Sequence, residues 1–247
     1  MTEPCLEDID VVILAGGLGT RIQGVLGDTP KLLAPVGAAP FLDLLILRLK
    51  SFGARRLVLG LGHLAEKVTA HLNANPHLGI QGGVDIITAT EPEPLGTAGA
   101  LRFVRPHIKT NPVMVMNGDS FFAADLCEFV TAHRSGGTEG SILCAPVDDT
   151  ARFGRLDISV EGRVQAFLEK NATLAGPGII NAGVYLFSAA MLDAIDERPG
   201  PSLERDVFEQ LPPGTLGAVT GEGAFIDIGT PGDLARAADV LAPFSDT

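Results

Sequence analysis

The sequence predicts an α/β protein in three layers, with a mixed, mainly parallel sheet and helices on both faces. Two observations support this fold class. In the first half of the chain, short apolar and β-branched runs alternate with longer amphipathic segments, as in a parallel sheet crossed by helices. The composition, 46% hydrophobic with 30 glycines and 17 prolines among 247 residues, is typical of a globular chain rich in turns.

The first half contains five expected strands and three expected helices. The strands are the apolar runs at residues 11–14, 57–61, 84–88, 113–116 and 141–147. A helix is expected over residues 40–52, because Pro40 suits a first helical turn and Gly53 suits the position after the last. The other two helices are expected at residues 98–105 and 125–134.

The second half has a different rhythm. Two short runs at residues 155–160 and 163–168 flank Glu161-Gly162 and predict a hairpin. A strand is expected at 179–187, helices at 188–196 and 202–211, a last strand at 224–228, and a closing helix that ends at Leu241. Because no Pro/Ser-rich linker or run of charge divides the chain, residues 1–247 are predicted to form a single domain. No repeat indicates a C-terminal β-helix after the last helix.

Charge and cysteine content narrow the class of protein. Eighteen Lys and Arg against thirty Asp and Glu give a net charge of −12, which disfavours nucleic acid and anionic membrane as partners. Cys5, Cys127 and Cys144 are widely spaced and predict neither a disulfide nor a metal cluster, which favours the reducing cytoplasm. The acidic N-terminus lacks the basic start of a signal peptide, and no apolar run approaches the roughly 20 residues of a membrane helix.

Residues 11–21, Val-Val-Ile-Leu-Ala-Gly-Gly-Leu-Gly-Thr-Arg, indicate a buried strand followed by a glycine-rich loop. The glycines let backbone N–H groups approach an anion, and Arg21 and Lys31 add positive charge, so the segment predicts a phosphate-binding loop. A Walker loop would end in Gly-Lys-Ser/Thr, and a dinucleotide fingerprint would need glycine in place of Ile22. The alternative is a glycine-rich surface turn with incidental charges.

Two aspartates adjoin apolar strands. Asp119 follows the run 113–116, at the sheet edge where open parallel sheets bind ligands, and Asp227 lies inside the run 224–228. A carboxylate between two isoleucines is costly to bury unless it is paired or bound to metal. Together the two are expected to hold Mg²⁺, although Asp119 alone is also compatible with a turn or a helix cap. The five histidines, His63 among them, have no motif around them and are expected on the surface or in packing.

The glycine-rich loop resembles the signature of the sugar-nucleotidyltransferases, Leu-Ala-Gly-Gly-x-Gly-Thr-Arg-Leu followed by Pro-Lys. Here it covers residues 14–22 with Pro30-Lys31, and Ile22 replaces the last leucine. Further segments follow in the family's order: Glu93-Pro94-Leu95-Gly96-Thr97-Ala98-Gly99-Ala100, Asn117-Gly118-Asp119, Phe153-Gly154, Phe167-Leu168-Glu169-Lys170, Asn181-Ala182-Gly183-Val184-Tyr185-Leu186-Phe187 and Asp227-x-Gly229-Thr230-Pro231. One departure is Leu32, where many relatives have proline after the lysine.

The resemblance implies a Rossmann-like, nucleotide-diphospho-sugar transferase-like fold. Its nucleotide-binding half would span about residues 9–150 and its sugar-phosphate-binding half about residues 151–247. Arg21, Lys31 and Lys170 would be catalytic cations, and Asp119 and Asp227 would bind Mg²⁺. The implied nucleotide-binding residues are Leu14, Ala15, Gly16, Gly17, Gly19, Thr20, Leu95, Gly96 and Thr97. The implied sugar-phosphate-binding residues are Asn117, Gly154, Glu169, Lys170 and Asn181.

The implied reaction joins a nucleoside triphosphate to a sugar 1-phosphate. An oxygen of the sugar phosphate would attack the α-phosphorus in line and displace pyrophosphate. Because this nucleophile is already ionised at neutral pH, positioning and charge neutralisation would suffice without a general base.

The segment from Glu93 to Ala100 resembles guanylyltransferases more than thymidylyltransferases, which usually carry Gly-Leu-Ala-Gln there. The chain length and Phe41-Leu42 resemble D-glycero-α-D-manno-heptose-1-phosphate guanylyltransferases, with mannose-1-phosphate enzymes next. GTP and the heptose 1-phosphate are therefore the expected substrates. Mannose 1-phosphate, a different sugar 1-phosphate with UTP, dTTP or CTP, and a nucleotide-sugar-sensing subunit without turnover stay open. The sequence carries no prediction of oligomeric state.

Overall fold

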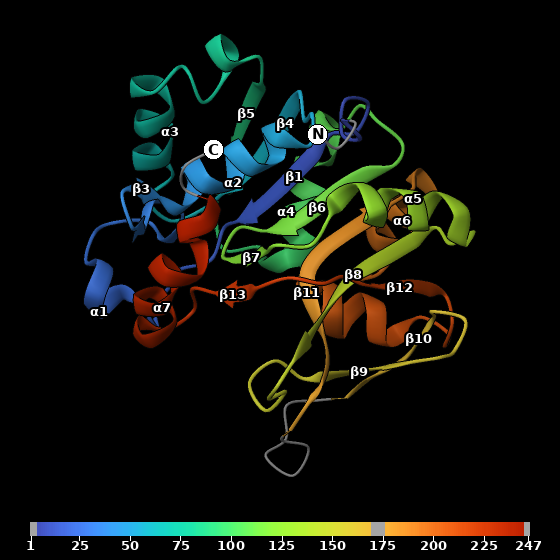
Figure 1. Cartoon of the computed structure of the whole chain (residues 1–247). Helices are drawn as coiled ribbons and strands as arrows, with labels where there is room; N and C mark the ends of the chain where they lie inside the picture. The colour runs from blue at the N-terminus through green and yellow to red at the C-terminus, as the bar shows by residue number, and fades with distance from the viewer. Residues whose placement is uncertain (1–3, 169–175, 245–247) are drawn as a thin grey trace.

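A seven-stranded sheet forms the centre of the computed structural model, which describes residues 4–168 and 176–244 (Figure 1). The strands lie in the order β12-β8-β11-β6-β1-β4-β5. All run in one direction except β11, which is antiparallel to its neighbours β6 and β8. Their bounds are β1 Val11–Ala15, β4 Arg56–Leu61, β5 Asp85–Thr90, β6 Val113–Asn117, β8 Gly140–Val147, β11 Gly178–Phe187 and β12 Leu216–Thr220.

Helices cover both faces of this sheet, which confirms the predicted three layers. Side chains alternate along β1, so that Val11 and Ile13 join one core and Val12 and Leu14 join the other. The first core packs under α2 (Phe41–Ser51), α3 (Ala65–Ala74), α5 (Leu126–Gly136) and α7 (Pro231–Leu241), and the second under α4 (Gly96–Val104) and α6 (Ala189–Asp196). Figure 1 shows α2 in front of the sheet and α4 behind it.

The order of the strands places a binding site beside β1. From β1 the chain proceeds outward to β4 and β5, and it then returns to β6 on the other side of β1. In open α/β sheets, ligands bind at the carboxyl ends of the strands where the order reverses in this way. The glycine-rich loop follows β1 and Asn117-Gly118-Asp119 follows β6, so both predicted motifs meet at this point.

Small two-stranded sheets complete the fold. Strand β7 (Ser120–Phe122) pairs antiparallel with β13 (Phe225–Asp227), and β9 (Arg155–Ile158) forms the predicted hairpin with β10 (Val164–Leu168). A third pair, β2 (Pro35–Val36) and β3 (Ala39–Pro40), precedes α2, and a short helix α1 (Gln23–Leu26) follows the glycine-rich loop. The last predicted strand is thus confirmed as β13, although it lies outside the main sheet.

Two features of the second half differ from the prediction. The segment expected as a helix over 202–211 is a π-helical turn, Leu203–Val207, followed by a 3₁₀ turn, Phe208–Gln210. The segment begins where the Ser202 hydroxyl accepts the backbone N–H of Arg205, and it ends before Pro212-Pro213, which cannot continue a helix. Strand β12 was not predicted, because Gly217 and Ala218 give it little β propensity.

The prediction that the cysteines are unpaired is wrong for two of the three. Cys5 and Cys127 form a disulfide that closes 122 residues of chain, whereas Cys144 is free and buried. The backbone N–H groups of Cys5 and Leu6 both donate to the carbonyl of Phe52, which fixes the N-terminal segment to the end of α2, and Cys127 lies in the first turn of α5. Wide spacing in sequence gave no sign of this contact, and the cysteines therefore lend no support to a reducing compartment.

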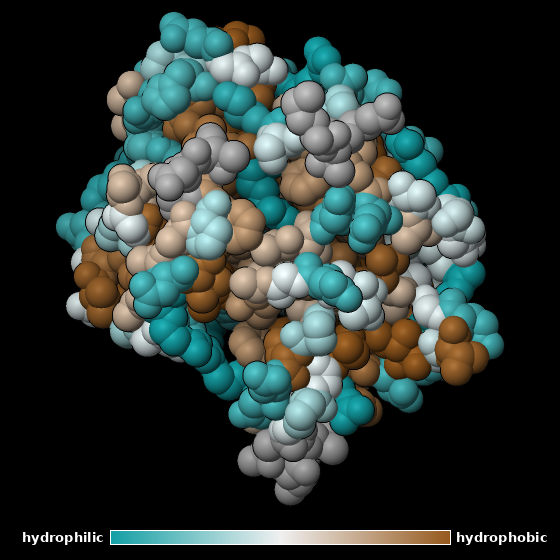
Figure 2. Space-filling model, viewed as in Figure 1, coloured by the Kyte–Doolittle hydropathy of each residue, from teal (hydrophilic) through white to brown (hydrophobic). Residues whose placement is uncertain are grey.

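Polar and apolar residues are interspersed on the face of the molecule that Figure 2 shows. The apolar side chains with high exposure include Ile80 and Val160, which lies in the turn between β9 and β10. Within residues 4–168 and 176–244, no helix has the length and apolar character needed to span a membrane.

Candidate active site

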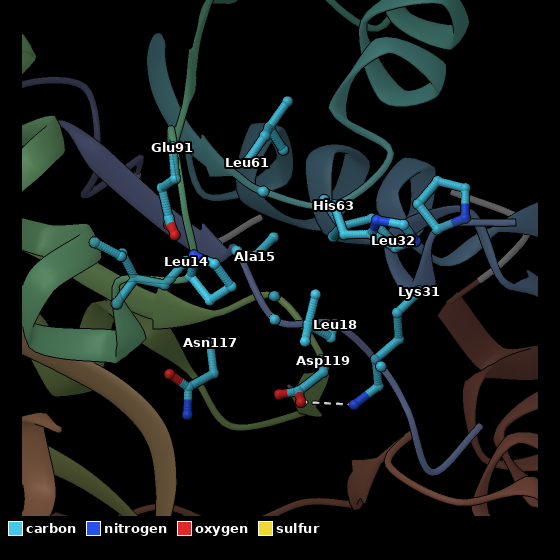
Figure 3. A pocket seen from close by; sticks show the side chains of 18 of the residues that line it. Leu14, Ala15, Leu18, Lys31, Leu32, Leu61, His63, Glu91, Asn117 and Asp119 are labelled. Carbon is cyan, nitrogen blue, oxygen red and sulfur yellow. Dashed lines mark hydrogen bonds and ion pairs between the residues drawn. The ribbon is translucent and has the colours of Figure 1, made fainter. Parts of the chain in front are cut away.

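A pocket of about 510 Å³ opens at the carboxyl ends of β1, β4 and β6. Most of the residues predicted to bind nucleotide lie in its wall. The predicted residues that line it are Leu14, Ala15, Gly16, Gly17, Gly19, Thr20, Arg21, Lys31, Gly96, Thr97, Asn117 and Asp119. Figure 3 shows Lys31 and Asp119 near one end of this pocket and Glu91 near the other.

The glycine-rich loop is held tightly against its neighbours. A side chain at Gly16 would overlap the carboxylate of Glu91, and one at Gly62 would overlap the carbonyl of Gly16. Gly19 has a positive φ of 60°, which favours glycine, and the buried side chain of Ile22 anchors the end of the loop. Gly16 and Gly62 are therefore needed because neighbouring groups leave no space for a side chain, and Gly19 because of its backbone conformation.

Two carboxylates and a lysine meet beside this loop. Strand pairing aligns Asp227 with Ser120, and the backbone N–H of Ile228 donates to the carbonyl of Asp119 at 2.9 Å. The Nζ atom of Lys31 lies 2.6 Å from Oδ2 of Asp119 and 3.9 Å from Oδ1 of Asp227. The sequence placed Asp119 and Asp227 on separate strand ends, and the β7–β13 pair brings them together.

Asp227 has the character of a cation ligand. Its Oδ1 atom is buried and accepts no hydrogen bond from the described residues. Burial raises the pKa of Asp227, the charge of Asp119 raises it further, and Lys31, the N–H of Gly229 and Arg21 oppose the shift. A divalent cation would relieve both the burial and the repulsion, and two carboxylates beside a phosphate loop are hard oxygen donors of the kind Mg²⁺ takes. The described residues contain no cluster of three or more His, Cys, Asp or Glu side chains that could hold a metal ion, so Asp119 and Asp227 are the candidate protein ligands.

The segment from Glu91 to Thr97, which follows β5, contributes to another side of the pocket wall. Leu95 does not line the pocket, but it precedes the first turn of α4, and its backbone N–H donates to Oε2 of Glu91 at 3.2 Å. The hydroxyl of Thr97 accepts a hydrogen bond from the backbone N–H of Leu203 at 2.8 Å. The N-terminus of α4 therefore faces the pocket with its first residues fixed from both sides.

The predicted sugar side is only partly described. Asn117 lines the pocket with a buried Oδ1 that accepts no hydrogen bond from the described residues. Asn181 lies in β11 outside the pocket wall; its amide donates to the Tyr185 hydroxyl at 2.9 Å and its Oδ1 accepts the N–H of Gly183 at 2.8 Å. Gly154, with a φ of 78°, ends the loop before β9. Glu169 and Lys170 lie outside the described residues.

Sequence reasoning missed two titratable residues of the pocket, Glu91 and His63. Glu91 follows β5 and is 6% exposed, and its Oε1 is buried without a hydrogen-bond partner among the described residues. Burial raises the pKa of Glu91, and the N–H of Leu95 opposes this. His63, expected on the surface or in packing, is exposed but lines the pocket, just before Leu64 with its positive φ of 60°. Glu91 had one available signal, its place directly after a strand at the same sheet edge as Asp119.

Two curated relatives of this chain are named as sugar-1-phosphate guanylyltransferases. The chain is 33% identical over 93% of its length to mannose-1-phosphate guanylyltransferase of Mycobacterium tuberculosis, of which the match covers 64%. It is 31% identical over 93% of its length to D-glycero-α-D-manno-heptose 1-phosphate guanylyltransferase of Aneurinibacillus thermoaerophilus, of which the match covers 96%. The chain thus spans less than two thirds of the M. tuberculosis protein and nearly all of the A. thermoaerophilus one.

A solved structure shares the fold of this chain. The crystal structure of HddC from Yersinia pseudotuberculosis matches 94% of this chain and 98% of its own with a TM-score of 0.80 and 33% identity, and it has also been determined in complex with GMP-PN. The family model described as nucleotidyl transferase matches residues 10–242, almost the whole chain. This chain belongs to the nucleotidyl transferase family.

Proposed function

We propose that the protein transfers a guanylyl group from GTP to a sugar 1-phosphate and releases pyrophosphate. D-glycero-α-D-manno-heptose 1-phosphate is the first candidate acceptor and mannose 1-phosphate the second, since relatives at 31% and 33% identity carry those names. The nucleotide-binding half would be about residues 9–150 and the sugar-phosphate-binding half about residues 151–247. The cytoplasm is the proposed compartment, on the acidic N-terminal sequence alone, since the Cys5–Cys127 disulfide does not favour it.

The described side chains support an in-line reaction driven by charge. The glycine-rich loop would hold the triphosphate through its backbone N–H groups, and Arg21 would neutralise its outer phosphates. Lys31, poised between Asp119 and Asp227, would reach the phosphates that are joined and split. Asp119 and Asp227 would hold Mg²⁺, which neutralises phosphate charge when bound. Lys170 would hold the sugar phosphate, and Asn117, Gly154, Glu169 and Asn181 would face the sugar.

The proposed preference for guanine over adenine rests on Glu91. Guanine presents two adjacent donors, N1–H and the N2 amine, which match the acceptor oxygens of one carboxylate. Adenine presents an acceptor at N1 and no amine at C2, so it cannot make this pair. Because Oε1 of Glu91 is buried and lacks a partner among the described residues, a guanine would satisfy a group that other bases leave unpaired.

Replacing Glu91 with Gln is expected to lower kcat/KM for GTP by about tenfold to a hundredfold, because a charged hydrogen bond contributes about 1.5–3 kcal/mol. The preference for GTP over ITP, which lacks the N2 amine, should fall in the same variant. Steady-state kinetics with GTP, ITP and ATP measure both effects. Glu128→Gln is the matched control, since Glu128 is exposed on α5 and does not line the pocket. If the two variants behave alike, Glu91 does not read the base.

A variant of Lys170 tests the proposed binding of the sugar 1-phosphate. Lys170→Ala is expected to raise the apparent KM for the sugar 1-phosphate by more than that for GTP, because a lost charge contact affects only the substrate it holds. Titration of each substrate at saturating levels of the other gives the two constants. Lys109→Ala, which removes an exposed lysine, serves as the control. Equal effects on both substrates would show that the assignment is wrong.

A further inference from the structure

We infer that Arg152 and Asp233 form a positioning pair that fastens the loop before β9 to the segment carrying Asp227. Asp233 lies in the first turn of α7 and is only 3% exposed. Its carboxylate accepts from both terminal nitrogens of Arg152, at 2.9 and 2.5 Å, so the two side chains meet in the bidentate geometry. The pair joins positions 81 residues apart in the sequence.

Two more donors complete the surroundings of Asp233. The hydroxyl of Thr230, the N-cap residue of α7, donates at 2.6 Å, and Arg236 donates at 2.7 Å. The hydrogen bonds from Arg152, Thr230 and Arg236 hold the pKa of Asp233 well below its usual range. A buried carboxylate with this many donors is satisfied without a ligand, so its role is to hold other parts of the chain.

The Arg152–Asp233 pair joins the loop that contains Gly154, on the proposed sugar side, to the segment that contains Asp227, on the proposed cation side. Asp227 lies three positions before Thr230, at the end of β13, and Arg152 lies two positions before Gly154. Phe153, the neighbour of Arg152, contacts Phe225, two positions before Asp227, so the two segments are close. Arg236, in contrast, is on the same helix as Asp233, so its ion pair joins two positions of one helix and no distant segments.

Aromatic packing reinforces the same junction. Phe153 packs edge-on against Phe225 of β13, with ring centroids 5.5 Å apart, and the guanidinium of Arg152 lies 5.4 Å from the centroid of the Phe153 ring. The loop is therefore held to β13 and α7 by both an ion pair and a ring contact. Loosening Arg152 would let the loop with Gly154 shift relative to Asp227.

The kinetic consequence rests on the proposed function. If Gly154 faces the sugar and Asp227 holds the cation, Arg152→Met should lower kcat/KM for the sugar 1-phosphate by about tenfold or more, since displacements of about 1 Å have such effects. The apparent KM for GTP should change by less than about twofold, because the glycine-rich loop is not part of the junction. Arg152→Lys, which keeps the charge but loses the bidentate contact, should be intermediate.

The control is Arg236→Met, which removes another guanidinium from the same carboxylate without separating the segments. It should leave both kinetic constants within about twofold of the wild type. Hydrogen exchange supplies a readout independent of activity: Arg152→Met should speed amide exchange at residues 150–154 and 227–230, and Arg236→Met should not. Equal kinetics and equal exchange in the two variants would overturn the inference. A wild-type protein without guanylyltransferase activity would overturn the proposed function alone, because the exchange comparison still tests the pair.

Discussion

Changing Asp119 or Asp227 to Asn is expected to lower kcat by a factor of about 10² to 10⁴. Asn keeps the size of the side chain but removes its charge, and charge stabilisation by a bound cation contributes several kcal/mol to such a reaction, with each 1.36 kcal/mol giving tenfold in rate. Because Lys31 lies within 4 Å of both carboxylates, each change also removes a partner that positions the lysine. Pyrophosphate release from GTP with heptose or mannose 1-phosphate, titrated with Mg²⁺, measures the loss.

Two controls separate this effect from misfolding. Asp239→Asn changes an exposed carboxylate of α7 and should leave kcat unaffected. Asp227→Asn should not lower the melting temperature, since the burial and the Asp119 charge that raise the pKa of Asp227 make its ionised form costly. Undiminished pyrophosphate release by the wild type in excess EDTA would contradict the proposed cation site.

Reduction of the Cys5–Cys127 disulfide is expected to lower the free energy of unfolding by about 4–5 kcal/mol. The bond closes a loop of 122 residues, and in the chain-entropy model a loop of about 100 residues contributes about 4.7 kcal/mol. For a protein of this size the loss corresponds to a fall of about 10 °C or more in the melting temperature. Thermal unfolding with and without reductant measures it.

The variant Cys5→Ser shows whether the loss of stability in reductant comes from the Cys5–Cys127 disulfide. Its melting temperature should lie near that of the reduced wild type and should not respond to reductant. Thiol titration of the unreduced, denatured wild type should find the single thiol of Cys144. Titration of all three cysteines under those conditions would show that the bond does not form in solution.

The sequence predicted best the elements whose signal is local. Strand β1, helix α2 between Pro40 and Gly53, and the glycine-rich loop all follow from periodicity and turn residues within about fifteen positions. Helix α3 went unpredicted because only Ala65 and Val68 of it are buried, which leaves a weak apolar stripe. The same local signals predicted a site at the edge of the sheet where the pocket opens.

Contacts between distant segments could not be predicted in this way. The pairing of β13 with β7, which joins Asp227 to Asp119, depends on two strands of three residues each. Glu91 carries no motif of its own, and its place after a strand does not reveal that its carboxylate is buried beside Gly16 in the pocket wall. The partner of Cys5 likewise depends on how the N-terminal segment packs against α5, which no local pattern encodes.

The late position of β13 has a consequence for synthesis. A ribosome completes the glycine-rich loop, Lys31 and Asp119 first, and Asp227 follows about 100 residues later, roughly 5–20 s at common elongation rates. During this interval an emerging chain can pair β1, β4, β5 and β6 beside a glycine-rich loop that still lacks the second of its two neighbouring carboxylates. Assembly of the paired aspartates is therefore tied to the synthesis of β13, and chains that stop before it are without the complete charge arrangement.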